Sequence, residues 1–294
     1  MSRPLVIDIK KQALPSSSGI QITIFFKGCQ LNCLWCHSPE VIDPDMEIGF
    51  YPSKCLACGS CVEVCPVRAC SLDNPGRIDR QRCKRCGRCT EVCSGFSLRR
   101  IGIYYPAEKI LELVLQDQIF YRSQPGWVIL SGGEPTLYLS YISTLLRMLK
   151  EKGICTAIKT NGLFDATEFQ EIILEFLDLI YFDIKLVHPG LHCLYTGQRN
   201  EQILDNLTLL MKLCPKKVVP RIPLVPGITT TDEARQSMSN LFQRLGIKEY
   251  VLLPYSSLGH SKLQNLGKLP LMPHAQAGAE NLSWRQEGKP VAIP

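Results

Sequence analysis

The chain has 294 residues, a formal net charge of +6, and 45% hydrophobic and 20% charged residues. This length allows one large domain or two ordinary ones, and the apolar share is enough for a sizeable buried core. A transmembrane helix is not expected, because no run of about eighteen apolar residues is present. The N-terminal sequence lacks the apolar stretch of a signal peptide, so we expect a cytoplasmic protein.

Cysteine is the outlying residue type. The chain has 15 cysteines, and most of them lie between residues 29 and 100. Disulfides are disfavoured in a cytoplasmic protein, so ligation of metal ions or clusters is the leading interpretation.

The first predicted element is a strand over residues 20–26, an alternating apolar run rich in β-branched residues. Directly after it comes Cys29-Gln-Leu-Asn-Cys33-Leu-Trp-Cys36, a C-x3-C-x2-C motif. Three thiolates without an evident fourth ligand can hold an iron–sulfur cluster and leave one iron open to a small molecule. A zinc site completed by His37 is the alternative, although adjacent residues seldom reach one metal ion together.

Two copies of the spacing C-x2-C-x2-C-x3-C follow, at residues 55–65 and 83–93. This is the spacing of bacterial two-cluster ferredoxins, in which the fourth cysteine of each motif binds the other cluster. The spacing therefore predicts two [4Fe–4S] clusters. One would be held by Cys55, Cys58, Cys61 and Cys93, and the other by Cys83, Cys86, Cys89 and Cys65.

Two structural zinc sites are the alternative for these motifs, but zinc is satisfied by paired C-x2-C knuckles and does not need evenly spaced sets of four thiolates. We assign these two motifs to a small ferredoxin-like domain at residues 47–99, inserted in a main domain of residues 1–46 and 100–294. We assign no function to the remaining cysteines, because free cysteine packs as a small apolar residue. These are Cys70, Cys155, Cys193 and Cys214.

From residue 101 onward, short apolar runs alternate with amphipathic helical patterns. Strands are predicted at 127–130, 155–158, 179–182, 217–222 and 250–253. Helices are predicted around 142–149, 169–176, 203–210 and 234–241. The last of these begins with capping-box spacing at Thr230-Thr-Asp-Glu233. With the first strand, the pattern indicates six parallel strands in an α/β fold, either an open sheet or a barrel, with its chemistry at the carboxyl ends of the strands.

Ser131-Gly-Gly-Glu-Pro135 directly follows the predicted strand at 127–130. Alone, this motif would indicate only a turn. Because it stands at a strand end and the chain also carries the C-x3-C-x2-C motif, it indicates a ligand-binding site.

Together, these residues closely resemble the radical S-adenosylmethionine (SAM) superfamily, and within it the activating enzymes of glycyl radical enzymes that carry a ferredoxin-like insert. Trp35 stands at the family's aromatic position, and Ser131-Gly-Gly-Glu-Pro135 at its SAM-binding motif. Other similar segments are Phe120-Tyr-Arg-Ser123, Asp183-Ile-Lys185, Arg221-Ile-Pro-Leu-Val-Pro-Gly227 and Leu252-Leu-Pro-Tyr255. The resemblance covers nearly the whole chain and implies a partial (β/α)6 radical SAM barrel.

The resemblance also implies the chemistry. Cys29, Cys33 and Cys36 would hold a [4Fe–4S] cluster whose fourth iron is chelated by SAM. One electron would cleave SAM to methionine and a 5′-deoxyadenosyl radical, which abstracts hydrogen from a backbone glycine of a partner enzyme. No catalytic side chain beyond the cluster is implied. The implied SAM-binding residues are Trp35, Gly132, Gly133, Glu134, Thr160, Asp183, Lys185 and Arg221.

Within that pocket, the lack of side chains at Gly132 and Gly133 would let the backbone approach SAM, and Glu134 could accept a hydrogen bond from its ammonium group. A buried ion pair is the alternative for Asp183, Lys185 and Arg221. Lys159 stands where the family has an acidic residue before Thr160-Asn-Gly162. We expect Lys159 to pair with Asp183 across the mouth of the barrel, because an uncompensated buried lysine is costly.

Bound clusters would lower the net charge of the protein. With oxidised clusters, the two four-thiolate sites carry −2 each and the three-thiolate site −1, which moves +6 to about +1. We therefore expect a monomer that binds neither nucleic acid nor membrane. The implied partners are a glycyl radical enzyme and an electron donor of the flavodoxin or ferredoxin type. Basic residues near the second ferredoxin motif either compensate cluster charge or form a docking face for that donor: Arg77, Arg80, Arg82, Lys84, Arg85 and Arg88.

Two other functions fit part of this pattern. An iron–sulfur electron-transfer protein would use the ferredoxin motifs but would not need the C-x3-C-x2-C motif or Asp183-Ile-Lys185. A radical SAM enzyme acting on a small molecule or another protein residue would share the same cleavage of SAM. A test for SAM cleavage separates the first function from an activating enzyme, and a radical assay on a glycyl radical enzyme separates the second.

Overall fold

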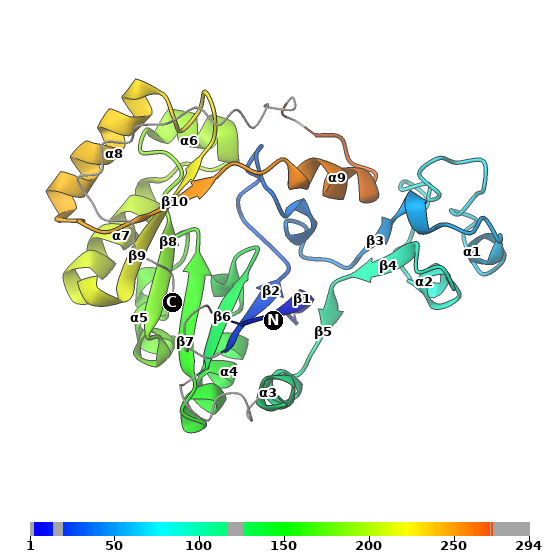
Figure 1. Ribbon diagram of the computed structural model, residues 1–294, viewed down its shortest axis with the longest axis horizontal. Helices are drawn as coiled ribbons and strands as arrows, with labels where there is room; N and C mark the ends of the chain where they lie inside the picture. Colours follow the sequence, from blue (N-terminus) through cyan, green and yellow to red (C-terminus); the bar gives the residue numbers. More distant parts are fainter. Residues whose placement is uncertain (1–2, 14–19, 117–125, 271, 273–294) are drawn as a thin grey trace.

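The computed structural model describes residues 3–13, 20–116, 126–270 and 272. Its centre is a sheet of eight strands in the order β10-β9-β8-β7-β6-β2-β1-β5 (Figure 1). Neighbouring strands from β2 to β10 run parallel. They are β2 (Ile20–Phe26), β6 (Trp127–Gly132), β7 (Cys155–Thr160), β8 (Leu179–Asp183), β9 (Val218–Leu224) and β10 (Val251–Pro254). These are the six strands that the sequence predicted.

Two antiparallel strands extend the sheet beyond β2 and were not predicted. β1 (Leu5–Ala13) pairs with β2, and β5 (Ile103–Tyr104) pairs with the start of β1. Because β1 covers the open edge of β2, the first parallel strand becomes an interior strand. Its side chains Ile22, Ile24 and Phe26 are fully buried.

The longer helices follow the strands in sequence. They are α3 (Ala107–Leu115), α4 (Leu139–Glu151), α5 (Ala166–Ile172), α6 (Pro189–Thr196), α7 (Glu201–Leu213), α8 (Asp232–Leu245) and α9 (Leu258–Asn265). Short 3-10 turns lie at Pro39–Val41, Pro52–Lys54, Pro135–Tyr138, Leu174–Phe176 and Pro215–Lys217. The four predicted helices correspond to α4, α5, α7 and α8.

The helix boundaries differ from the prediction by a few residues, and two of them have a clear local cause. The helix expected to reach residue 176 ends at Ile172, and the apolar spacing continues in the 3-10 turn Leu174–Phe176. The cap of α8 is Thr231, whose hydroxyl accepts from the Ala234 amide at 3.2 Å. Thr230, where the capping-box spacing began, instead accepts from the Gly227 amide at 3.1 Å.

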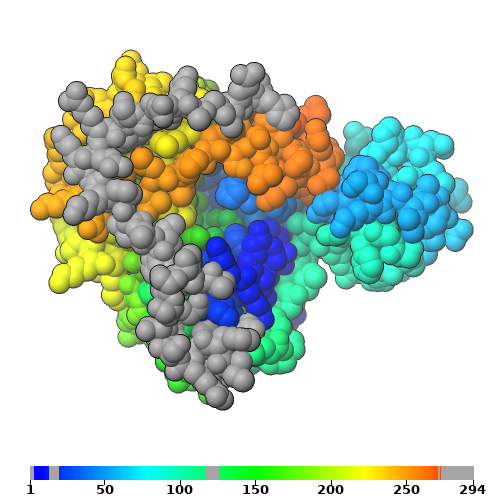
Figure 2. Space-filling view, viewed as in Figure 1, coloured from blue at the N-terminus to red at the C-terminus, as the bar shows by residue number. Residues whose placement is uncertain are grey.

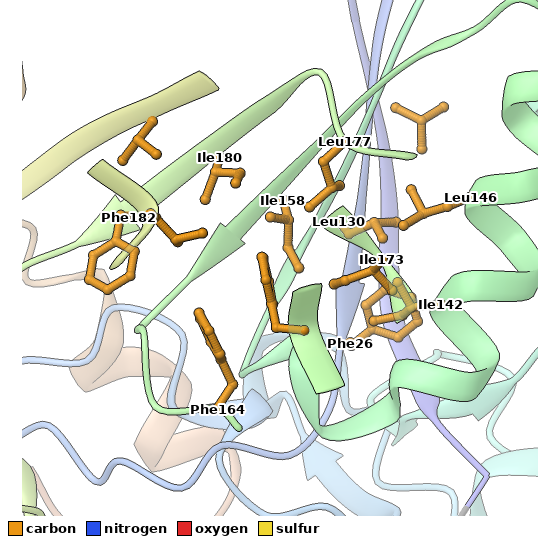
Figure 3. Packing of buried hydrophobic residues seen from close by; sticks show 14 of the residues in the cluster. Phe26, Leu130, Ile142, Leu146, Ile158, Phe164, Ile173, Leu177, Ile180 and Phe182 are labelled. Atoms are coloured by element: carbon orange, nitrogen blue, oxygen red, sulfur yellow. The ribbon is translucent and has the colours of Figure 1, made fainter. Parts of the chain in front are cut away.

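The main hydrophobic core lies between the helices and one face of the sheet. Ile142 and Leu146 of α4 pack with Leu130, Ile158 and the other buried strand residues of that face (Figure 3). Side chains alternate between the two faces of a strand, so the neighbouring strand residues point to the opposite face. That face has its own smaller group of buried residues, Ile129, Ala157 and Tyr181. Side chains further along the same strands on this face can therefore form a site.

The cysteine-rich region forms a lobe that protrudes from the main sheet (Figures 1 and 2). Its base is a two-stranded antiparallel sheet, in which β3 (Glu47–Phe50) pairs with β4 (Leu98–Ile101). The lobe also contains the short helices α1 (Ser60–Glu63) and α2 (Arg88–Glu91). Its small core consists of Ile48, Phe50, Cys70, Ile78, Cys89 and Leu98.

No helix in the described part of the chain is long and apolar enough to cross a membrane. The segment Phe120-Tyr-Arg-Ser123, one of those that carry the resemblance, lies outside the described residues.

Candidate functional site

The loop with Cys29, Cys33 and Cys36 leaves the carboxyl end of β2, where the sequence predicted chemistry. Backbone bonds to α6 fix its far side, because the amides of Asn32 and Leu34 donate to carbonyl oxygens at the end of that helix, at 2.8 and 3.0 Å. Its near side is fixed by the Cys29 amide, which donates to the Ile42 carbonyl oxygen at 3.1 Å. The loop that carries the three thiols is thus held on two sides by the fold.

Burial has the largest effect on the pKa values of these thiols. It raises the pKa of Cys29 to about 11 and the pKa of Cys33 to about 12, and it also raises the pKa of Cys36. The charge of Lys185 acts on all three thiols in the opposite direction. Burial alone would lower the pKa of Lys185, but Asp183 and the thiols outweigh it and raise that pKa. The cation of Lys185 therefore lies near three half-buried cysteines.

This donor set fits an iron–sulfur cluster. Thiolate is the ligand of [4Fe–4S] clusters, and iron supplies the positive charge that stabilises buried thiolates. Among the described residues, no three His, Cys, Asp or Glu side chains are arranged to hold a single metal ion.

The two glycines of the Gly-Gly-Glu turn allow the end of β6 to cross the end of β2. Gly132 has φ of +113°, and a Cβ on it would lie 2.2 Å from the Phe26 carbonyl oxygen. A Cβ on Gly133 would lie 2.0 Å from the carbonyl oxygen of Gly28. The role predicted for these glycines is to let the backbone approach a ligand. The structure shows that the protein's own backbone already requires them.

Glu134, which follows these glycines, is fully buried, and its carboxylate joins the ends of β6 and β7. Oε1 accepts from the Thr136 amide at 3.1 Å, the Thr136 hydroxyl at 2.8 Å and the Thr160 hydroxyl at 2.9 Å. Oε2 accepts from the Asn161 amide at 2.7 Å. Glu134 and Thr160, two of the predicted SAM-binding residues, thus bind each other. Acceptance of a ligand ammonium by Glu134 stays a prediction.

Asp183, Lys185 and Arg221 converge at the ends of β8 and β9, as predicted. Asp183 lies opposite Arg221 in the strand register. The Arg221 guanidinium donates to Asp183 Oδ1 from Nε at 2.7 Å and lies 2.6 Å from it at a second nitrogen. Lys185 Nζ lies 3.8 Å from Asp183 Oδ2. Asp183 therefore lies between two cations, which is the ion-pair arrangement considered for these residues.

The expected pair between Lys159 and Asp183 was wrong. Lys159 lies opposite Tyr181 in the register, two positions before Asp183, and its ammonium lies 5.8 Å from the centre of the Tyr181 ring. Arg221 also contacts this ring, at 5.4 Å. Burial and the nearby Arg221 charge lower the pKa of Lys159 to about 8, against a smaller opposing effect of Asp183. The strand register thus pairs Asp183 with Arg221, and Lys159 lies over the ring of Tyr181 instead.

The remaining predicted residue near the loop is Trp35. Its ring packs against Tyr195 of α6, with 6.2 Å between ring centres. On the other side of the loop, α9 contacts the backbone at Cys36, because a Cβ on Gly259 would lie 2.1 Å from the Cys36 carbonyl oxygen. Lys262 of α9 pairs with Glu40 at 2.6 Å. A helix far along the chain therefore also holds this loop.

Asn161 was missed by the sequence analysis. Its side-chain nitrogen Nδ2 donates to Cys29 Sγ at 3.7 Å. The signal that could have indicated it is its position directly after Thr160, at the carboxyl end of a predicted strand.

In the lobe, a pocket is lined by Cys55, Cys58, Cys61 and Cys93, the four cysteines predicted for one cluster. Arg77 also lines it and donates to Cys55 Sγ at 3.5 Å. The Ala57 amide, followed by weaker effects that include Arg77, lowers the pKa of Cys55. A hydrogen bond with Ser60 lowers the pKa of the exposed Cys58. These contacts favour the thiolate form at Cys55 and Cys58, whereas burial raises the pKa of Cys61 in the same pocket.

The second predicted set spans the core and the surface of the lobe. Cys89 is buried, Cys65 and Cys83 are half-buried, and Cys86 is exposed. Cys65 Sγ accepts from the Ala69 amide at 3.1 Å. Cys70, to which no function was assigned, lies in the same small core and hydrogen-bonds Cys89, which lowers the pKa of Cys89.

Some of the basic residues of the lobe have structural roles. Arg77 is buried. Arg80 donates to the carbonyl oxygens of Ile48 and Asn265, at 2.5 and 3.2 Å, so it ties the lobe to the end of α9. Arg85 pairs with Asp43 at 2.9 Å. The remaining three, Arg82, Lys84 and Arg88, are exposed.

Comparison with known proteins identifies the family of the chain. The family model of the Radical SAM superfamily matches residues 23–237. The chain is 35% identical over 269 residues to the trans-4-hydroxy-L-proline dehydratase activating enzyme of Clostridioides difficile, covering 90% of this chain and 88% of that protein. It is 34% identical over 279 residues to the benzylsuccinate synthase activating enzyme of Thauera aromatica, covering 91% and 83%.

A third relative is the isethionate sulfite-lyase activating enzyme of Desulfovibrio desulfuricans, which is 34% identical over 271 residues and matches 90% of this chain and 86% of that protein. These matches extend over nearly the whole of both chains in each case. The chain therefore belongs to the radical SAM superfamily and, within it, to the activating enzymes of glycyl radical enzymes.

Proposed function

We propose that the loop of Cys29, Cys33 and Cys36 binds the [4Fe–4S] cluster and SAM with which this activating enzyme generates a radical on a backbone glycine of its partner. When bound, the cluster and SAM supply an electron and the cleavable sulfonium that together yield the 5′-deoxyadenosyl radical. The observation that carries the proposal is the convergence of three half-buried cysteines and Lys185 near the Gly-Gly-Glu turn, to which Asn161 connects Cys29 by its bonds to Glu134 and the Cys29 sulfur. These groups come from separate strand ends, and only the fold brings them together.

The side chains of the pocket have separate roles in this proposal. Lys185 balances the negative charge of the three thiolates and lies in contact range of Asp183. Arg221 and Asp183 form a fixed ion pair that presents a rigid polar wall at the ends of β8 and β9. Glu134 holds the turn in place through Thr136, Thr160 and Asn161. Chemistry that depends on a radical benefits from such rigidity, because a positioned reactant does not need to be ordered again.

We further propose that residues 47–99 are a ferredoxin-like domain with two [4Fe–4S] clusters that carry electrons to the first site. The support is the pocket lined by Cys55, Cys58, Cys61 and Cys93, and the N–H donors that favour thiolates there. The lobe also has its own base sheet and its own small core. Its electron donor would be a flavodoxin- or ferredoxin-type protein, and the exposed Arg82, Lys84 and Arg88 remain free to attract an acidic surface.

The partner class follows from the family, and the particular partner is open. The three relatives act with enzymes of unlike substrates, a hydroxyproline dehydratase, a sulfite-lyase and benzylsuccinate synthase. We propose that this chain likewise activates one glycyl radical enzyme, whose own active site selects the substrate.

The test is anaerobic and has two readouts. Reconstituted protein reduced with dithionite should convert SAM to 5′-deoxyadenosine and methionine in equal amounts. Addition of a glycyl radical enzyme should give the electron paramagnetic resonance signal of a glycyl radical. Cys193→Ala, on the exposed side of α6, is the matched cysteine control and should behave as wild type. Protein that holds its clusters but does not cleave SAM would contradict the proposal.

A further inference from the structure

We propose that Asn161 is a positioning residue that makes the cluster at Cys29 easier to reduce, by donating a side-chain N–H to the Cys29 sulfur. The inference rests on the proposed function, because it takes Cys29 as a cluster ligand. Asn161 lies in the turn after β7, far from Cys29 in sequence and adjacent to it in the fold.

The first step concerns which end of the amide faces the sulfur. The two ends of an Asn side chain are assigned from their partners. Asn161 Oδ1 accepts from the Leu163 amide at 2.8 Å, and this bond requires the oxygen on that side. The nitrogen therefore faces Cys29 Sγ, at 3.7 Å. The Asn161 side chain thus presents its N–H donor to the Cys29 sulfur, which is the acceptor.

The second step concerns rigidity. The Asn161 amide is held by Glu134 Oε2 at 2.7 Å, and the next amide, that of Gly162, donates to the Thr160 hydroxyl at 3.0 Å. Asn206 of α7 donates from Nδ2 to the Gly162 carbonyl oxygen at 2.9 Å. Asn161 itself is 5% exposed. The donor is therefore fixed before any cluster binds.

The third step concerns the charge that this donor offsets. The Glu134 carboxylate accepts four hydrogen bonds, which favour its ionised form, although burial outweighs them and raises the pKa of Glu134. The charge of Glu134 raises the pKa of Cys29, so it disfavours added negative charge at that sulfur. Reduction adds an electron to the cluster, and N–H groups that point at the ligand sulfurs stabilise that added charge. Asn161 thus counteracts Glu134 at the same ligand.

Two substitutions test this. Asn161→Asp keeps an oxygen for the Leu163 amide and loses the donor, while Asn161→Ala removes the donor without adding a charge. The measurement is a redox titration monitored by electron paramagnetic resonance, following the reduced-cluster signal that changes when SAM is added. At a fixed solution potential, the ratio of reduced to oxidised cluster should fall several-fold in Asn161→Ala and further in Asn161→Asp.

The matched control is Asn206→Ala. Asn206 holds the same turn, because its Nδ2 donates to the carbonyl oxygens of Gly162 and Phe164 at 2.9 and 2.8 Å. Its loss should leave the potential unchanged even where the variant is less stable. An unchanged potential in Asn161→Ala, an equal shift in Asn206→Ala, or loss of the cluster from both Asn161 variants would overturn the inference.

Failure of the proposed function has a different signature. In that case wild-type protein would show no cluster signal that responds to SAM. A wild-type signal that responds to SAM, with unchanged potentials in the Asn161 variants, would leave the proposed function intact and remove only the role of Asn161.

Discussion

The main domain and the lobe differ in what sets the pKa of their thiols, although burial also raises the pKa of Cys61 in the lobe. In the main domain, burial raises the pKa of Cys29, Cys33 and Cys36, and the loop that carries them is fixed by α6, α9 and the strand ends. In the lobe, hydrogen bonds lower the pKa of Cys55 and of the exposed Cys58. In the main domain the surrounding elements fix the loop before a cluster binds, whereas in the lobe hydrogen bonds favour the thiolate form of Cys55 and Cys58.

The two regions also differ in what stabilises them. The large core of the main domain consists of aliphatic and aromatic residues from strands and helices. Cysteines make up much of the smaller cluster in the lobe: Cys70 and Cys89 are in its core, and Cys55, Cys61, Cys65, Cys83 and Cys93 pack against it. A core of this size supplies little hydrophobic stabilisation, and small domains of this kind depend on metal. We expect the lobe to need its clusters in order to fold, and the main domain to fold without them.

A buried ion network joins the two regions. Lys27 follows β2 directly, is fully buried, and donates to Glu47 Oε2 at 2.8 Å and to the Asp43 carbonyl oxygen at 2.6 Å. Lys268 binds the other Glu47 oxygen, Oε1, at 2.6 Å. Because Glu47 begins β3, this network fixes the entry to the lobe relative to the strand that carries the first cysteine loop.

The largest expected effect is a difference in SAM cleavage between variants of the first cysteine loop and variants of the lobe. Cys33→Ala should abolish SAM cleavage and lower the iron content by about a third of roughly twelve atoms, since a [4Fe–4S] cluster holds four. Cys58→Ala should also lose iron but keep cleavage with dithionite, because its thiol lies in the lobe. Iron analysis and 5′-deoxyadenosine assays on both variants check this. Wild-type protein that saturates near four irons would refute the two clusters in the lobe.

Removal of iron tests the difference in stability. Anaerobic treatment with a chelator should unfold the lobe while the main domain stays folded, because only the lobe core is built around cysteines. Limited proteolysis followed by mass spectrometry should then find the first cuts between residues 51 and 97. First cuts in α4 or α7 would show that the two regions do not differ in this way.

Substitution of Lys27, which links the main domain to the lobe through Glu47, should have a smaller effect. Lys27→Met leaves Glu47 with Lys268 as its remaining partner. Breaking a buried ion pair from one side costs about 3 kcal/mol. Lys109→Met, which breaks an exposed pair with Glu112, should cost less than about 0.5 kcal/mol. Anaerobic denaturant unfolding of cluster-loaded protein gives both values, and equal costs would show that the junction network contributes no more than a surface pair.

The smallest effect concerns Lys159 and depends on pH. Its native pKa of about 8 lies below the ordinary value of 10.5. Folding therefore penalises the charged form, fully below pH 8, and the penalty fades as pH rises toward 10.5. Each pKa unit is worth about 1.4 kcal/mol, so Lys159→Met should be more stable than wild type by about 2 kcal/mol at pH 7, allowing for partial exposure of the ammonium.

At pH 9.5 most of this advantage should be gone. Anaerobic unfolding at both pH values measures the difference, with Lys216→Met as the control at an exposed position. A stability difference that stays constant between the two pH values would mean that Lys159 is not held in a destabilising environment.

The parallel strands and the cysteine motifs could be predicted from sequence because both are local patterns. A strand such as β6 is a short apolar run ended by Gly-Gly, and a cluster-binding loop is a fixed spacing of cysteines. The same locality explains why β1 was missed. Its sequence Leu5–Ala13 carries adjacent charged and polar residues, and its role depends on the exposed edge of β2 that it covers.

The charge partners within the site could not be predicted in this way. Lys159 and Asp183 lie near the ends of the adjacent strands β7 and β8. Because Lys159 is opposite Tyr181, two residues before Asp183, the ion-pair partner of Asp183 is Arg221 on the other side. Likewise, Asn161 meets Cys29 only because β6 lies between β2 and β7 and its Glu134 holds the turn after β7. Sequence by itself determined which groups this protein carries and on which strand ends they stand. Tertiary structure decided which of them touch, because pairing depends on register and strand order, and neither is encoded in the spacing of residues along a single segment.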